Sequence, residues 1–119
     1  MKQNTICTIA DVINDIKDKY KSEGETALYA DNNWHIYVAN DELSLTSVCC
    51  ITAPPDFDEE TDEEIIPRFA AENGMDGSLL PEIIQDVIIS ALAQKSDAIN
   101  EELIKALNYY LSNDTFMTF

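Results

Sequence analysis

The sequence of 119 residues contains few of the residues from which most catalytic and metal sites are built. It has one histidine (His35), three cysteines and three glycines. Three glycines are too few for a Gly-rich loop that cradles phosphate. One histidine and three scattered cysteines also lack the spacing typical of zinc ligands. We therefore expect neither a metal centre nor a cofactor.

Basic residues are equally scarce. The sequence has seven Lys and Arg residues and 23 Asp and Glu residues, which gives a formal net charge of −16. A protein that binds nucleic acid needs basic side chains to displace counterions from phosphates, and an anionic membrane surface also attracts basic segments. The composition disfavours both as direct partners. A basic protein is the partner that this charge favours.

Long apolar runs are absent from the sequence. No stretch matches a signal peptide or a transmembrane helix, so we expect a cytoplasmic protein. The cysteine count is odd, and the neighbours Cys49 and Cys50 would point to opposite faces of a strand. We therefore interpret the thiols as small buried side chains rather than a disulfide framework. The length and the 45% of hydrophobic residues predict a single domain over residues 1–119 with a real core.

The first half of the chain predicts one helix followed by a small sheet. Apolar periodicity predicts a helix over residues 8–23, with Thr8 as its cap, Asp11 at the third helical position and Gly24 as its stop. Candidate strands cover residues 26–30, 34–38 and 45–52, separated by turns at 31–33 and 40–42. Together they predict an antiparallel meander of two or three strands.

The second half predicts three helices. The short one covers residues 67–73, with Phe69 as its buried anchor and Gly74 as its end. A longer helix follows a Ser78 cap, and its expected apolar stripe is Leu80, Ile83, Ile84, Val87, Ile88, Ala91 and Leu92. For the last helix we expect a cap at Ser96 or Asp97 and a stop at Asn113. Its expected inward residues are Ile99, Leu103, Leu107, Tyr110 and Leu111. The apolar tail 115–119 should dock back, and the order of elements predicts an α+β fold.

An acidic run occupies residues 56–64, where seven of nine positions carry a carboxylate. Such a run repels itself and is typical of a solvated loop or a polar helix start, which Thr61 and Glu64 could cap. It superficially resembles a calcium-binding loop that begins at Asp56. In that register, however, Thr61 stands where glycine is needed and Pro67 where glutamate is needed, so an EF-hand is excluded.

Most of the negative charge lies in one part of the sequence. Residues 22–94 hold sixteen acidic residues and one Arg, Arg68. This asymmetry has two interpretations, solubility alone or a surface that faces a basic partner. Under the second, the candidate interface consists of Asp56, Phe57, Asp58, Glu59, Glu60, Asp62, Glu63, Glu64, Trp34 and Tyr37. Phe57, flanked by acids, is the favoured aromatic anchor, whereas the alternation of Trp34 with Ile36 and Val38 favours core packing.

No pattern in the sequence indicates catalysis. A small enzyme that uses His35 with Cys49 or Cys50 is an alternative. However, a lone strand histidine is more often structural, and neither cysteine has the local sequence of an activated thiol. We therefore expect a protein that is not an enzyme and has no catalytic residue.

From Trp34 onward the sequence resembles small acidic bacterial immunity proteins of polymorphic toxin and contact-dependent growth inhibition systems. The segments that carry the resemblance are residues 34–38, 56–64, 67–75, 84–88, 107–111 and 113–116. The resemblance implies a cytoplasmic protein that neutralises one cognate toxin, often a nuclease. Its partner would be the C-terminal toxin domain of a secreted effector.

Charge and resemblance together predict an immunity protein that binds a basic toxin domain, such as a ribonuclease, by electrostatic complementarity. A nuclease presents a basic cleft to its polyanionic substrate, so an acidic inhibitor can cover that cleft. The alternative in the same class is an acidic adaptor or nucleic-acid mimic that binds another basic protein.

Overall fold

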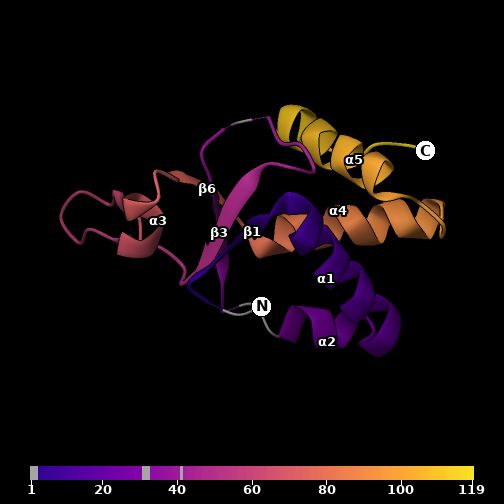
Figure 1. Ribbon diagram of the computed structural model, residues 1–119, viewed down its shortest axis with the longest axis horizontal. Helices are drawn as coiled ribbons and strands as arrows, with labels where there is room; N and C mark the ends of the chain where they lie inside the picture. The colour runs from indigo at the N-terminus through magenta and orange to yellow at the C-terminus, as the bar shows by residue number, and fades with distance from the viewer. Residues whose placement is uncertain (1–2, 31–32, 41) are drawn as a thin grey trace.

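A four-stranded antiparallel sheet lies between α3 (Arg68–Glu72) at one end of the molecule and the larger helices at the other (Figure 1). The computed structural model describes residues 3–30, 33–40 and 42–119. Its strands are β1 (Thr5–Thr8), β2 (His35–Val38), β3 (Val48–Thr52) and β6 (Gly77–Leu79), in the order β1-β3-β2-β6. Three helices cover one face of this sheet, namely α1 (Ile9–Glu23), α4 (Pro81–Gln94) and α5 (Asn100–Asn113).

The predicted N-terminal helix is confirmed as α1. The Asp11 backbone N–H donates to Thr8 Oγ1 at 3.3 Å, and the Thr8 N–H donates to Asp11 Oδ2 at 3.0 Å, which completes a capping box. The helix ends at Gly24, whose φ of +88° favours glycine. Its apolar face is buried as expected and includes Ile9, Val12, Ile13 and Ile16.

The strand predicted at residues 26–30 is wrong, because this segment forms a second helix, α2 (Glu25–Ala30). The helix continues directly from Gly24, whose carbonyl accepts the Leu28 N–H at 3.2 Å, and Leu28 is its buried residue. Ala27, Leu28 and Ala30 are good helix formers, and this local preference prevails over the short apolar run. The turns predicted at 31–33 and 40–42 include residues 31, 32 and 41, which lie outside the described residues.

The central hairpin of the predicted sheet is confirmed, with His35 opposite Thr52 and Val38 opposite Cys49. The third strand begins at Val48 rather than at residue 45. The sheet has four strands rather than two or three, because β1 pairs with β3 and β6 pairs with β2. These additional strands have four and three residues, too short for a clear alternating pattern.

The three helices that follow the central hairpin are also confirmed: α3 (Arg68–Glu72), α4 and α5. The predicted N-caps of α4 and α5 are wrong. Ser78 lies in β6, and α4 begins instead with Pro81, whose fixed φ suits the first helical turn. The last helix begins after Ile99, not after Ser96 or Asp97. There the Glu102 carboxylate accepts the Ile99 N–H at 3.2 Å.

The inward faces of the last two helices largely follow the predicted stripes. The predicted residues Ile84, Val87, Ile88, Ala91, Leu92, Leu103 and Leu107 are buried, and Ile83 and Tyr110 are half-buried. Leu80, Ile99 and Leu111 are exposed instead, because they lie before or near the ends of their helices. The left-handed stop is Asp114 (φ 55°), one residue later than predicted.

The C-terminal tail docks back as expected. The Phe116 ring lies 5.1 Å from the Tyr110 ring, centroid to centroid. Gln94 Nε2 donates to the Met117 carbonyl at 3.1 Å, and Gln94 Oε1 accepts the Phe119 N–H at 2.9 Å. These contacts tie the tail to α5 and to the end of α4. The α+β class predicted from the sequence is also confirmed.

Asn108 joins α5 to the segment before β3. Its Oδ1 accepts the Leu43 N–H at 3.0 Å, and its Nδ2 donates to the Leu43 carbonyl at 2.6 Å. We expect Asn108→Ala to lower the free energy of unfolding by about 1–3 kcal/mol, because both backbone groups of the buried Leu43 lose their partner. Urea denaturation measures this. Asn113→Ala on the exposed end of α5 is the control, and equal losses in the two variants would contradict the role of Asn108.

Candidate protein interface at the acidic hairpin

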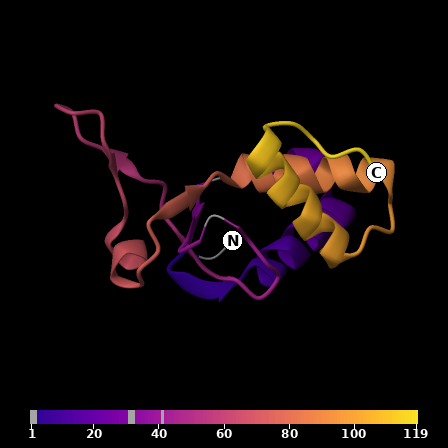
Figure 2. The same ribbon diagram turned by 90° about the horizontal axis from the view of Figure 1, so that it is seen from above.

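The acidic run forms a β-hairpin, neither the loop nor the helix start that the sequence favours. Its strands are β4 (Asp56–Phe57) and β5 (Glu64–Ile65), with Asp56 opposite Ile65 and Phe57 opposite Glu64. We call residues 56–65 the acidic hairpin. It extends away from the sheet together with α3, along the longest dimension of the molecule, which is 44 Å against 28 and 26 Å (Figure 2).

Asp58 organises the turn of the acidic hairpin. Its Oδ1 accepts the backbone N–H groups of Glu60 at 2.8 Å and Thr61 at 3.1 Å. The Asp62 N–H donates to the Asp58 carbonyl at 2.9 Å, and Asp62 has a φ of 58°. These N–H donors lower the pKa of Asp58, because they favour its ionised form. Thr61 Oγ1 accepts the Glu63 N–H at 3.4 Å and caps no helix, so the helix start predicted as one alternative for this run is wrong.

The carboxylates of the acidic hairpin face solvent. Asp58 is half-buried, and the other six acidic residues are exposed. Among residues 3–30, 33–40 and 42–119, no ion pair joins one of these carboxylates to a Lys or Arg. Arg68, the only basic residue in positions 22–94, instead binds Glu72 within α3, with Nε 2.6 Å from Oε1. The negative charge of the hairpin is therefore not neutralised by described neighbours.

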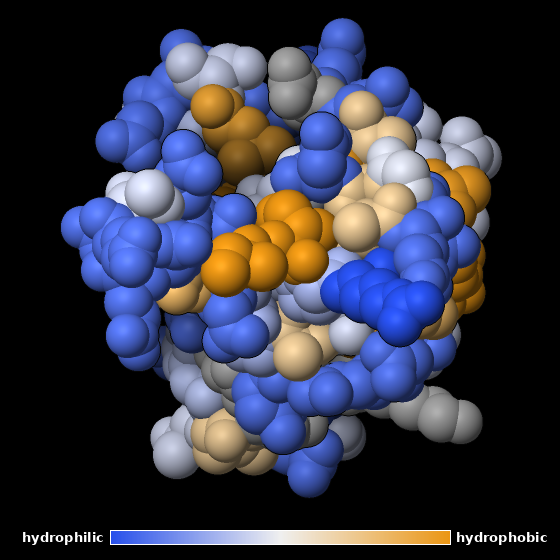
Figure 3. All heavy atoms as spheres, turned by 90° about the vertical axis from the view of Figure 1, so that its left-hand side faces the viewer, coloured by the Kyte–Doolittle hydropathy of each residue, from blue (hydrophilic) through white to orange (hydrophobic). Residues whose placement is uncertain are grey.

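An apolar hollow lies at the base of the acidic hairpin. It has a volume of about 420 Å³, and its walls are His35, Pro54, Pro55, Phe57, Glu64, Ser78 and Leu80. Phe57 is 62% exposed and Leu80 is 46% exposed. Figure 3 shows apolar side chains surrounded by hydrophilic ones on this end of the molecule. An exposed aromatic ring beside an apolar hollow, within a charged rim, is the usual arrangement of an interface anchor.

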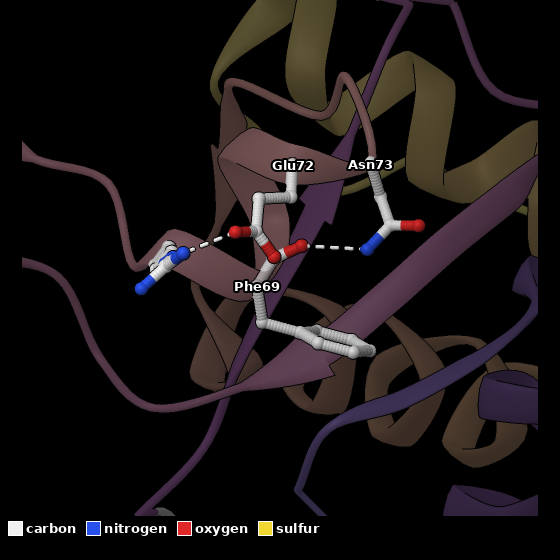
Figure 4. A network of polar contacts seen from close by, with 4 residues as sticks. Phe69, Glu72 and Asn73 are labelled. Atoms are coloured by element: carbon white, nitrogen blue, oxygen red, sulfur yellow. Dashed lines mark hydrogen bonds and ion pairs between the residues drawn. The ribbon is translucent and has the colours of Figure 1, made fainter.

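Helix α3 lies between the acidic hairpin and the sheet. Ala70, rather than the predicted Phe69, is its fully buried residue, and Phe69 is half-buried. Asn73 Nδ2 donates to the Phe69 carbonyl at 2.7 Å and thereby closes the end of the helix (Figure 4). Through Ala70, α3 packs on the second face of the sheet and fixes the position of the hairpin base.

Trp34 and Tyr37 do not belong to the interface that the sequence predicts. Their side chains are 2% and 0% exposed, so neither ring can contact a partner. Trp34 packs in the main core with Ile36. Tyr37 points to the other face of the sheet, donates its hydroxyl to the Ala53 carbonyl at 2.8 Å, and has its pKa raised by burial. The predicted interface is therefore reduced to residues of the acidic hairpin.

His35 and the cysteines do not form one constellation. His35 lies opposite Thr52, and its Nδ1 contacts the Trp34 carbonyl at 3.2 Å. Cys49 packs in the main core, while Cys50 lies among Tyr37, Ala70 and Met75, where burial raises its pKa. Among the described residues, no group of three or more His, Cys, Asp and Glu side chains could hold a metal ion.

The sequence did not predict that Pro54, Pro55 and Leu80 line the hollow. For Leu80 the sequence carried a usable signal. Pro81 follows it, and proline favours the first position of a helix, which leaves Leu80 before the helix and outside its buried stripe. Pro54 and Pro55 follow the candidate strand over residues 45–52, and no sequence pattern places them beside Phe57.

Exposure separates the three aromatic residues that the sequence proposed as anchors. We expect Phe57→Ala to change the free energy of unfolding by no more than about 0.5 kcal/mol, since its ring is in solvent. Trp34→Ala should cost about 3–5 kcal/mol, because it leaves a cavity in the core. Chemical denaturation of the two variants measures both values. A large loss from Phe57→Ala would mean that this ring stabilises the fold.

Comparisons with known proteins identify the family of the chain. In the part of the chain that the structure describes, no helix combines the length and the apolar character needed to cross a bilayer. No curated protein and no solved structure matches the sequence or the fold. Residues 5–119 match the family model described as "Domain of unknown function (DUF7716)", so the chain belongs to this family.

Proposed function

We propose that this protein is an immunity protein that binds and neutralises a basic toxin domain through its acidic hairpin. The observation that carries the proposal is the exposed hairpin itself, with seven carboxylates and no described basic partner beside the 62% exposed Phe57. The toxin domain would be a nuclease, since a nuclease must present basic side chains to a polyanion. The resemblance to immunity proteins gives independent support.

The proposed mechanism separates attraction from anchoring. Clustered carboxylates raise the rate at which a basic partner meets the hairpin, by about 10- to 1000-fold in favourable cases. Such attraction contributes more to the association rate than to affinity. Affinity needs a desolvated contact, which Phe57 and the apolar hollow beside it can supply. The hairpin would then cover the basic cleft and exclude the nucleic-acid substrate.

The decisive experiment is co-expression with a candidate toxin. The candidate is the C-terminal domain of a large secreted protein encoded next to the gene of this chain, and the readouts are bacterial growth and a stable complex. We expect the wild-type protein to restore growth. Complex formation with a different basic protein, without rescue by any neighbouring toxin domain, would instead favour an acidic adaptor or nucleic-acid mimic.

Charge reversal on the hairpin tests the proposed interface. We expect the triple variant Glu59→Lys, Glu60→Lys, Glu63→Lys to slow association at least about 10-fold at low salt and to abolish protection, because it reverses the attracting field. The matched control, Glu23→Lys, Asp97→Lys, Glu101→Lys, changes the net charge equally at exposed sites on other elements. Stopped-flow association over a range of salt concentrations measures the effect.

Equal slowing in the two triple variants would show that only net charge matters and would remove the hairpin as the interface. Unchanged protection by the hairpin variant would contradict the proposal in the same way. The anchor variant Phe57→Ala should raise the dissociation rate while leaving the salt dependence of association unchanged.

A further inference from the structure

Two cysteines that are distant in sequence lie opposite each other on neighbouring strands of the sheet. Cys7 of β1 lies directly opposite Cys49 of β3 in the antiparallel register, and their Sγ atoms are 3.7 Å apart. Both pack on the core face of the sheet. Cys50, the next residue along β3, points to the opposite face and packs with Tyr37 and Met75.

The backbone already has the geometry that a disulfide requires. Residues directly opposite each other on antiparallel strands have Cα atoms about 4.5–5.5 Å apart, within the range of about 4.4–6.8 Å that disulfides span. A contact of 3.7 Å between sulfurs leaves only side-chain rotation to bring them to bonding distance. The bond can therefore form without breaking the pairing of β1 with β3.

Solvent can reach one of the two thiols. Cys7 is partly exposed because β1 is an edge strand, whereas Cys49 is fully buried behind it. The hydrogen bond between the two thiols lowers the pKa of Cys7, while burial and the carboxylates of Asp11 and Asp15 oppose this effect. The same hydrogen bond, together with burial, raises the pKa of Cys49. Cys7 is thus the nucleophile of the pair and Cys49 the resolving thiol.

We propose that Cys7 and Cys49 are a reversible modification site, which a low-molecular-weight disulfide oxidises to an intramolecular disulfide. Cys7 Sγ, as thiolate, attacks one sulfur of the reagent and releases one equivalent of thiolate, leaving a mixed disulfide. Cys49 then loses its proton and attacks Cys7 Sγ, which releases the second thiolate. Two protein thiols are oxidised to one disulfide, and the reagent is reduced to two free thiols.

The bond would covalently hold the N-terminal strand in the sheet. β1 is an edge strand of four residues, and its last residue, Thr8, caps α1. A cross-link from β1 to β3 restricts the unfolded chain and keeps this cap in place, so the oxidised protein should melt at a higher temperature. The pair lies on the face of the sheet opposite His35, Tyr37 and Ser78, so the hairpin and its hollow are unchanged by oxidation.

The experiment uses the full chain, folded, with glutathione disulfide as the oxidant. Intact mass, the number of free thiols and peptide mapping are measured before and after oxidation. We expect wild type to lose two thiols and about 2 Da and to yield a Cys7–Cys49 cross-linked peptide. Cys50→Ala is the matched control, because it removes the neighbouring thiol on the other face and should form the same bond.

Cys7→Ala should gain no glutathione, since the partly exposed nucleophile is absent, and Cys49→Ala should stop at the mixed disulfide on Cys7. The melting temperature of wild type should rise on oxidation and return on reduction with dithiothreitol. Retention of all thiols by the folded wild type, or a bond that includes Cys50, would overturn the proposal. Because wild type itself carries the main test, a variant that fails to fold does not obscure the result, and neither outcome affects the test of the hairpin.

Discussion

Burial of one face of the four-stranded sheet is the constraint on which the rest of the structure depends. Ile36, Cys49 and Ile51 alternate with their neighbours along β2 and β3 and are fully buried against the helical layer. Because side chains on a strand alternate between faces, this choice sends His35, Tyr37 and Cys50 to the other face. Among the described residues, the short helix α3 and its neighbours Ile66 and Met75 cover Tyr37 and Cys50 on that second face.

The incomplete cover of the second face leaves the apolar residues of the candidate interface exposed. Leu80, Phe57 and Pro55 surround a hollow beside His35 at the end of the sheet that α3 does not fill. Ile6 and Val48, on the same face nearer the other edge, are also exposed, at 46% and 51%. The main core, in contrast, is closed by α1, α4 and α5, with Leu28 of α2 and Met117 of the docked tail also packed against it. Because the two faces of the sheet are covered unequally, the exposed apolar residues of the hollow lie next to the carboxylates of the acidic hairpin.

Long periodic segments were predictable from the sequence, and short ones were not. The helix over residues 8–23 was predicted with its cap, because Thr8, Asp11 and Gly24 act within a few residues of one another. β1 and β6 depend on hydrogen bonds from distant segments, so their three or four residues carry little local signal. The segment of α2 is different, because Ala27, Leu28 and Ala30 carry a local helix preference that the prediction of a strand overlooked.

For the candidate interface, the sequence predicted the charge but not the exposure. Phe57 was separable from Trp34 because acids flank it, but the burial of Tyr37 follows from α3, which packs over its face of the sheet. The cysteine pair was out of reach for a related reason. Adjacent Cys49 and Cys50 correctly indicated opposite faces, yet the partner of Cys49 lies on a strand that local patterns did not reveal.

The acidic hairpin contributes little to folding, and its charge opposes folding. Its strands have two residues each, both exposed, and an isolated hairpin of this size is at best marginally stable in water. Seven carboxylates within nine positions repel one another, and among the described residues no basic side chain offsets that repulsion. Solubility alone would be served equally by acids dispersed over the surface, without this local repulsion. Concentration of the charge on a projecting hairpin beside an exposed aromatic ring therefore supports the proposed basic partner, whose binding would relieve the repulsion that the free protein carries.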